Sequence, residues 1–536
     1  MYINDKILIG KNQKKELAIL LDKANRHGLI TGASGSGKTI TLKVMAESFS
    51  SAGVPVFLAD VKGDIAGTCM PGENSEKIKE RLANLAIDDF KFKGFPIHFW
   101  DVFGKKGHPI RTTVKDLGPE ILSRMLGLTE AGEGVLTIAF RIAEDKNLEL
   151  VDLKDLKILL TYLGAHYKEY ITTYGNITTQ SIGVIQRSLL QLESQGGTNF
   201  FGEPNLDIND FLKLNQEGLG YINIMDCVEL FKSPDLYSCF LLWLLTTLYN
   251  TLPEVGDLDK PKIVFFFDEA HLLFDDMPSY MLKEVTQIVK LIRSKGIGLY
   301  FISQAPTDIP DAIISQLGNR VQHNLRAYTP AEEKIVKVAA SAFRTNPEFN
   351  TVEAIKTLGT GEALISFQNM KGEPEIVEKC TILPPQSMMG SIDDGTRLMV
   401  MNNSLFKGKY DVPVDRESAY EKLSAELETE EKEKELAEKI KQEEKEKKEA
   451  EKEAAKLLKE EEKQKKALEK EKREKEKALK SSPIYKLGKK AGNKVVNKAL
   501  NKGVSALFGE TKSSKKKSSS SVGESLAKSL LKNLFK

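Results

Sequence analysis

The residues best suited to chemistry lie between positions 32 and 39, where Gly-Ala-Ser-Gly-Ser-Gly-Lys-Thr fits the phosphate-binding pattern G-x-x-x-x-G-K-[ST]. Glycines let backbone N–H groups converge on a phosphate, and a following helix adds unpaired donors and the positive end of its dipole. A Gly-rich turn at a strand–helix junction is the alternative. We expect ATP and Mg²⁺ as cofactors, with Lys38 on the β- and γ-phosphates and the Thr39 hydroxyl on the metal. The predicted contacts come from Gly32, Ala33, Ser34, Gly35, Ser36, Gly37, Lys38, Thr39 and Thr41.

A nucleotide site of this kind also needs acids, and the run Lys262–Phe267 supplies an apolar strand followed directly by Asp268 and Glu269. Asp268 would hold Mg²⁺, directly or through water, and Glu269 would polarise the attacking water. A solvated helix cap is the alternative for such a pair. Asp268 to His271 also spells a helicase-superfamily box, which we treat as coincidental because the other motifs of that superfamily are not evident.

Four further polar residues are candidates for the same site. Gln304 ends the apolar run that begins at Ile297, where it would sense the γ-phosphate or simply cap the strand. Asp60 ends another run and would support the water or Mg²⁺, or else form a surface turn. Arg293 and Arg320 are candidates for an arginine finger delivered to the nucleotide of a neighbouring subunit, with a structural role as the alternative for each.

The elements that would position these residues follow an alternating strand–helix pattern from His27 onward. Short apolar runs such as 55–60, 97–101 and 262–267 predict a mainly parallel sheet in an α/β fold, whose ligands collect at the carboxyl ends of the strands. The period changes to three and four between about 115 and 215, which predicts a helical insertion.

The predicted organisation has seven segments, and the last three differ in composition from the rest. Residues 421–480 are mostly Glu and Lys with many i,i+4 pairs, which favours a solvated single helix over a coiled coil. The segments are a lead-in hairpin (1–26), the first half of the core (27–114), the helical insertion (115–215), the second half of the core (216–385), a linker (386–420), the charged helix (421–480) and a basic Lys/Ser-rich tail (481–536).

The distribution of charge and the cysteine content limit which binding partners and which cellular compartment we expect. The net charge of +2 conceals a basic tail, because residues 481–536 hold thirteen lysines and two glutamates. We expect that tail to bind DNA or an anionic membrane surface, with a solubilising role as the alternative. The four cysteines show no C-x-x-C spacing, there is no signal-peptide core, and no apolar stretch approaches the length of a membrane span. These features predict a cytoplasmic protein without a transmembrane segment.

The motifs together resemble the HerA-like bacterial P-loop ATPases of the HerA–FtsK class. The resemblance is carried by the phosphate loop, by Leu58–Asp64, by Phe267–His271 and by Leu291–Gly296, and also by Ile302-Ser-Gln304 and Gly318-Asn-Arg-Val-Gln-His-Asn324. It covers about residues 5 to 390 and is closest to a poorly characterised subgroup. HerA proper has a β-barrel before the phosphate loop, whereas only a short lead-in precedes Gly32 here, so pairing with a nuclease is not expected.

This resemblance implies a RecA-like core and a hexameric ring acting on double-stranded DNA. It also favours Arg293 as the finger and Gln304 as the sensor. We therefore expect an ATP-hydrolysing DNA translocase or helicase. Two alternatives stay open: a secretion- or remodelling-type ATPase acting on polypeptide, and a nucleotide-gated scaffold tethered through its basic tail.

Overall fold

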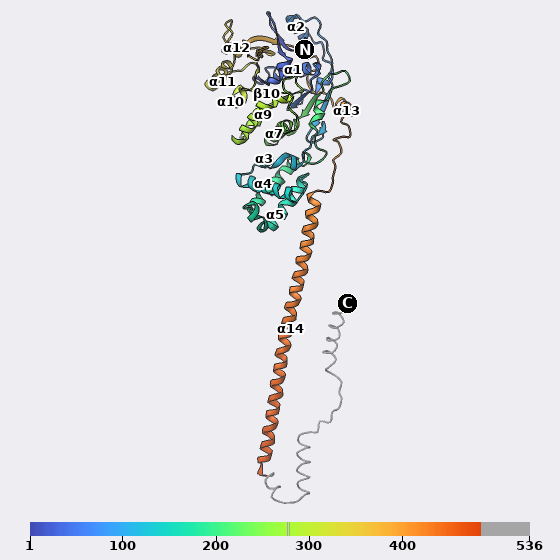
Figure 1. Ribbon diagram of the computed structural model, residues 1–536, viewed down its shortest axis with the longest axis vertical. Coiled ribbons are helices and arrows are strands. Elements are labelled where there is room, and N and C mark those ends of the chain that lie inside the picture. The colour runs from blue at the N-terminus through green and yellow to red at the C-terminus, as the bar shows by residue number, and fades with distance from the viewer. Residues whose placement is uncertain (276, 278, 484–536) are drawn as a thin grey trace. The chain divides into compact units, whose positions relative to one another are not determined.

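The computed structural model describes residues 1–275, 277 and 279–483 (Figure 1). Within them, thirteen strands belong to one sheet. These strands are β1 (Tyr2–Ile3), β2 (Lys6–Lys11), β3 (Glu16–Leu20), β4 (Gly28–Thr31), β5 (Val56–Asp60), β6 (Ile97–Asp101), β7 (His108–Pro109), β8 (Ile222–Asp226), β9 (Ile263–Phe267), β10 (Ile297–Ser303), β11 (Asn319–Gln322), β12 (Glu362–Ser366) and β13 (Glu378–Ile382).

The α-helices connect the strands or follow the last of them. They are α1 (Lys38–Ser51), α2 (Glu76–Leu85), α3 (Val114–Met125), α4 (Glu130–Asp145), α5 (Leu153–Tyr174), α6 (Thr179–Ser194), α7 (Pro234–Thr251), α8 (His271–Phe274), α9 (Ser279–Leu291), α10 (Asp311–Ile314), α11 (Pro330–Ser341), α12 (Thr351–Thr357), α13 (Asp394–Asn402) and α14 (Ala419–Ser481).

The centre of the sheet is parallel, in the order β11-β4-β10-β9-β5-β8-β6-β7. An antiparallel part, β12-β13-β2-β1 with β3 paired to β2, extends it from β11. Every residue of β5, β6, β8, β9 and β10 is buried, as the near-continuous apolar runs predict for parallel strands covered on both faces. The fold is the expected α/β fold with a mainly parallel central sheet.

Alternate residues of the central strands enter two separate hydrophobic cores. Phe265 and Phe267 of β9 face one core, which is packed largely by helices of the predicted insertion and by α7 and α9. Phe266 faces the other core, together with Phe49 of α1, and the two rings lie 6.3 Å apart. Between β7 and β8 the structure has the helices α3 to α6, in agreement with the three- and four-residue period (Figure 1).

Residues 386–418, predicted within a linker, instead pack against the rest of the core; we name them the C-terminal strap. The strap contains α13, whose Arg397 is buried, and the buried aromatic residues Phe406 and Tyr410. Its first residues donate backbone N–H groups to the buried carboxylate of Glu47 on α1. The sequence conceals this packing because the strap has no sustained apolar period.

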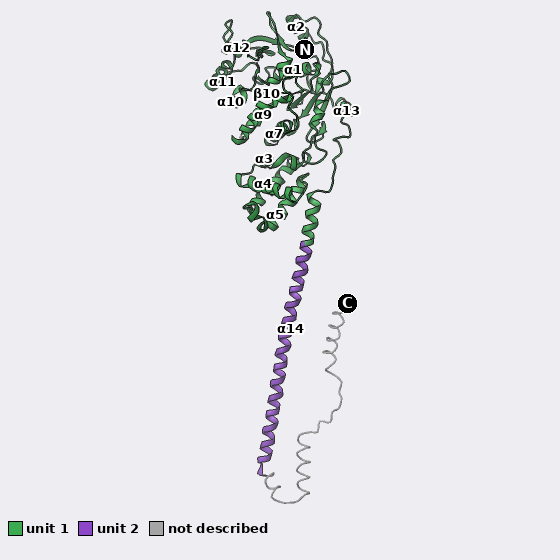
Figure 2. Cartoon of the chain, viewed as in Figure 1, with its two compact units in different colours: residues 1–429 green, residues 430–536 purple. Residues whose placement is uncertain are grey.

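The chain forms two compact units, residues 1–429 and 430–536; Figure 2 shows the first in green and the described part of the second in purple. The first unit contains the lead-in hairpin, both halves of the predicted core, the helical insertion and the strap. The predicted charged helix is confirmed as α14, while most of the predicted basic tail lies outside the described residues. All four cysteines are free. Among the described residues we find no helix with the length and apolar character that crossing a bilayer requires.

Candidate nucleotide site

The phosphate loop joins the end of β4 to the start of α1, which begins at Lys38. Gly37 has a φ of 113° and forms the N-cap of α1, so the chain enters the helix through a conformation that favours glycine. Gly32 is required by packing as well, because a Cβ atom there would lie 2.5 Å from the Cβ of His323. The loop can therefore direct its backbone N–H groups toward an anion at the helix N-terminus.

Residues that follow β11 and precede β12 brace this loop from outside. The carbonyl of Asn324 accepts from the N–H of Ala33 at 2.8 Å, and the N–H of Gly361 donates to the carbonyl of Ser36 at 3.1 Å. Both bonds fix loop residues to the antiparallel side of the sheet. Sequence reasoning did not single out either contact, since they connect segments about 290 to 330 residues apart.

His323 is the central bracing side chain. Its Nδ1 lies 3.0 Å from the carbonyl oxygen of Glu362 and its Nε2 lies 2.8 Å from the Thr41 hydroxyl. Burial lowers the pKa of His323 to about 4, so the ring is neutral at pH 7. Because a carbonyl can only accept, Nδ1 donates to Glu362 and Nε2 accepts from Thr41. Thr41, a predicted nucleotide contact, is fully buried, and its hydroxyl is bonded to His323.

Lys38 is the first residue of α1, and its side chain bonds to the start of the phosphate loop. Its ammonium donates to the carbonyl oxygens of Gly32 and, at 3.2 Å, of Ala33. Burial lowers the pKa of Lys38, while the nearby carboxylates of Asp268 and Glu269 oppose that shift. The loop and the acid pair are neighbours because β10 alone separates β4 from β9, and Phe301 of β10 is opposite both Leu29 and Phe267. Thr39, the next residue, stands half-exposed in the first turn of α1.

Asp268 and Glu269 follow β9 at the carboxyl edge of the sheet, and both are buried. Burial, together with the adjacent Glu269 carboxylate, raises the pKa of Asp268 to about 6. Glu269 has a φ of 47°, a left-handed conformation that a non-glycine residue rarely adopts. Its Oε2 atom is buried without a hydrogen-bond partner. Such a strained residue with an unsatisfied carboxylate oxygen is typical of a functional position.

Gln304 lies at the same edge. Ser303, the last residue of β10, is opposite Thr31 of β4, so Gln304 follows at the level of the first loop residue, Gly32. Its side chain is exposed. It is therefore free to approach a bound phosphate, as a sensor must.

Arg293 lies at the amino ends of the parallel strands, opposite to the phosphate loop, four residues before β10 begins at Ile297. The seven residues of β10 span about 23 Å at 3.3 Å per residue, which separates Arg293 from the phosphate loop of its own chain. Its guanidinium is 3.6 Å from the exposed carboxylate of Asp257. Arg293 is accordingly not placed to contact a nucleotide at the phosphate loop of its own chain.

Two other predicted residues have their polar groups engaged elsewhere. The guanidinium of Arg320 donates to the carbonyl oxygens of Ile314, Leu317 and Ala342, at 3.1 to 3.3 Å, and burial lowers its pKa. These bonds cap the ends of α10 and α11, so the structure does not bring Arg320 to the phosphate loop. Asp60 accepts three backbone N–H bonds from the turn that follows it, which realises the alternative of a turn.

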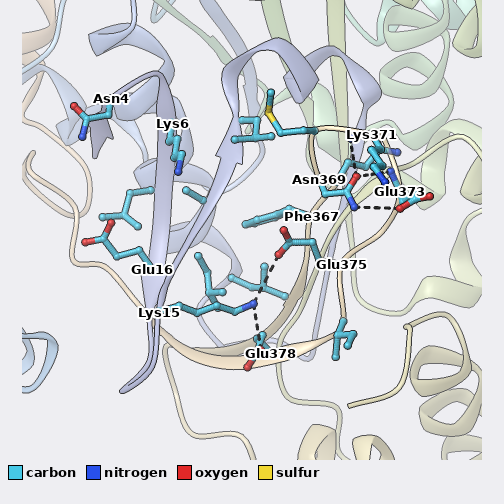
Figure 3. Close-up of a pocket in the computed structure, with 18 of the residues that line it drawn as sticks. Asn4, Lys6, Lys15, Glu16, Phe367, Asn369, Lys371, Glu373, Glu375 and Glu378 are labelled. Carbon is cyan, nitrogen blue, oxygen red and sulfur yellow. Dashed lines mark hydrogen bonds and ion pairs between the residues drawn. The ribbon is translucent and has the colours of Figure 1, made fainter. Parts of the chain in front are cut away.

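A different cavity, of about 590 Å³, lies between the β2–β3 hairpin and the β12–β13 region (Figure 3). Lys15 crosses it to Glu375 at 3.8 Å and to Glu378 at 3.2 Å. None of the phosphate-loop residues lines this cavity. It is therefore separate from the nucleotide site.

Comparison with known proteins agrees with the site. A family model described as Helicase HerA-like C-terminal matches residues 5–516. The chain is 24% identical over 378 residues to the DNA double-strand break repair helicase HerA of Sulfolobus acidocaldarius. The alignment covers 69% of this chain and 68% of that protein. The chain is also 24% identical over 385 residues to the HerA helicase of Sulfurisphaera tokodaii, with the same coverage of 69% and 68%.

Solved structures give more distant likenesses. The plasmid coupling protein TrwB in complex with ADP and Mg²⁺ has a TM-score of 0.45 and 13% identity, covering 69% of this chain and 89% of that chain. VirB4 of Thermoanaerobacter pseudethanolicus has a TM-score of 0.43 and 15% identity, covering 74% and 99%. The assignment rests instead on the family model, which spans most of the sequence: the chain belongs to the HerA-like helicase family and is a P-loop ATPase.

Proposed function

We propose that this ATPase is a Mg²⁺-dependent ring motor that moves along double-stranded DNA. The observation that carries the hydrolytic part is the meeting of the phosphate loop, the pair Asp268–Glu269 and Gln304 at one edge of the sheet. The DNA part is supported by the names of the two HerA relatives, which are DNA repair helicases. The ring is supported by the position of Arg293, which is too distant to serve its own site.

The residues of the site fit ATP and Mg²⁺. Gly32 lets the loop pack against His323, which leaves no room for a Cβ, and Glu269 presents a buried carboxylate oxygen without a hydrogen bond. Thr39 and Asp268 supply the hydroxyl and carboxylate oxygens that Mg²⁺ prefers. When held by these residues, Mg²⁺ would supply positive charge that offsets the negative charge of the phosphates.

The protein's own groups then have separate tasks. Lys38 exchanges its carbonyl partners Gly32 and Ala33 for phosphate oxygens, which offer stronger charge-assisted bonds. Glu269 orients the attacking water and accepts its proton, and Gln304 contacts the γ-phosphate. Lys38→Ala should therefore abolish nucleotide binding, whereas Glu269→Gln should bind ATP and hydrolyse it very slowly. A Glu269→Gln protein with the wild-type turnover rate would contradict the assignment.

The substrate is tested by the ATPase rate with and without duplex DNA. We expect stimulation by duplex DNA and little effect of an unfolded polypeptide at the same mass concentration. Stimulation by polypeptide alone would replace the DNA motor by a polypeptide-remodelling ATPase. An ATPase rate that neither polymer changes would contradict both kinds of motor.

The ring and the finger are tested together. Light scattering with ATP should give the mass of a hexamer, and a strict monomer at micromolar concentration would contradict the ring. In mixed rings, Arg293→Ala subunits should lower the activity of their wild-type neighbours while leaving nucleotide affinity unchanged. An activity that falls only in proportion to the mutant fraction would assign Arg293 a structural role.

A further inference from the structure

Lys62 brings a second ammonium group to the acid pair, beside Lys38. Its Nζ lies 3.9 Å from Oε1 of Glu269, whose side chain is only 11% exposed. Lys62 also lowers the pKa of Lys38, and it opposes the effect of burial on the pKa of Asp268. The side chain therefore reaches the acid pair from the turn after β5, whereas the acid pair itself follows β9.

The turn after β5 fixes the place of Lys62. The carboxylate of Asp60 accepts the N–H groups of Lys62 at 3.2 Å, of Gly63 at 2.7 Å and of Ile65 at 3.1 Å. Gly63 has a φ of 73°, which lets the chain reverse within these few residues. The backbone of Lys62 is thus held rigidly, while its half-exposed side chain remains free to follow the carboxylate of Glu269.

Glu269 has few other groups to orient its carboxylate. Its Oε2 makes no hydrogen bond and lies 3.5 Å from Nδ1 of His271, which is itself buried without a hydrogen-bond partner. The adjacent Asp268 is a like charge that repels it. A mobile carboxylate would present its oxygens to water in many orientations, and catalysis depends on holding the base in one.

We propose that Lys62 is a positioning residue: it holds the Glu269 carboxylate in the orientation that activates water, and the Asp60 turn presents it. This inference rests on the proposed ATP hydrolysis. The role differs from that of Lys38, because Lys62 acts through Glu269 and is not needed to bind nucleotide. Asp60 consequently contributes to the site through the backbone of its turn, although its carboxylate is not available to the nucleotide.

Steady-state and single-turnover ATPase assays on the full chain test the inference. Lys62→Ala should lower kcat about tenfold and leave the dissociation constant for ATP unchanged, whereas Lys62→Arg should restore most of the rate. The matched control is Lys115→Ala, because Lys115 is also an exposed lysine and pairs with Glu149 at 3.4 Å, but lies on α3 in the helical insertion. This control should keep the wild-type rate.

A double-mutant cycle separates positioning from a general structural effect. If Lys62 acts through Glu269, then Lys62→Ala combined with Glu269→Gln should be no slower than Glu269→Gln alone. Multiplication of the two losses, or a weakened ATP affinity with unchanged kcat, would overturn the inference. A wild-type protein without ATPase activity would refute the proposed function and this inference with it. An active wild type beside an equally active Lys62→Ala variant would refute the inference alone.

Discussion

Replacing Phe406 by alanine should destabilise the first compact unit by about 3–5 kcal/mol, the usual loss for a buried phenylalanine. Phe406 is 3% exposed and packs its ring 5.1 Å from Trp100 and 4.5 Å from His98. It lies in the strap, beyond the point where the apolar pattern of the sequence ends. The neighbouring Leu405 is 60% exposed and gives a matched control, because Leu405→Ala removes a side chain of similar size that buries little.

The assay is the urea unfolding midpoint of the two variants, with ATPase activity measured alongside. A strap that belongs to the motor predicts a clear loss for Phe406→Ala and a midpoint within experimental error of wild type for Leu405→Ala. Equal midpoints for both variants would refute the packing argument.

Truncation extends the same reasoning to the whole strap. Ending the chain at Thr429 follows the boundary between the compact units and should leave folding and ATPase activity intact. Ending it at Leu383 removes Phe406 and Tyr410, which together contribute more than about 6 kcal/mol, against the 5–15 kcal/mol that stabilises a domain. It also leaves the buried carboxylate of Glu47 without its backbone donors. The shorter chain should therefore fail to fold, and a cooperative unfolding transition with active ATPase would contradict this.

The remaining predictions concern the brace and pH. Thr41→Val should weaken ATP binding only modestly but lower stability by about 1–3 kcal/mol, because the acceptor nitrogen of His323 loses its donor; a loss of binding alone would refute the brace. Burial lowers the pKa of both His27 and His323 to about 4, so the unfolded chain binds protons first as pH falls below about 6.5. Stability, followed by urea midpoints, should hence fall between pH 7 and 6. Below about pH 6 the raised pKa values of Asp60 and Asp268 act in the opposite direction.

Much of the fold could be predicted because buried parallel strands have short, nearly continuous runs of apolar residues in the sequence. The predicted strand 97–101 coincides with β6, and the apolar run that begins at Ile297 and ends at Gln304 contains β10, which stops one residue earlier. The phosphate loop could be predicted as well, since its glycines and lysine are contiguous. The strap could not: it is held by single aromatic residues and by backbone donors to Glu47, and neither produces a period in the sequence. Arg320 was predicted as a candidate finger for a similar reason. Its three partners are backbone carbonyl groups, which every residue has, so the sequence does not reveal these bonds.

The acids at the carboxyl edge of the sheet show why residue type alone could not assign them. The adjacent strands β9, β5, β8 and β6 all end at or next to an aspartate: Asp268, Asp60, Asp226 and Asp101. Asp60 and Asp101 each accept three backbone N–H groups from the following turn, and Asp226 lies 3.6 Å from the buried arginine of α13. Only after β9 does a second acid follow, and there Glu269 keeps a buried oxygen without a hydrogen bond. An aspartate at the end of a strand therefore often stabilises the following turn by accepting its backbone N–H groups. The availability of a carboxylate oxygen, which depends on contacts across the sheet, is what favours Asp268 and Glu269 for the chemistry.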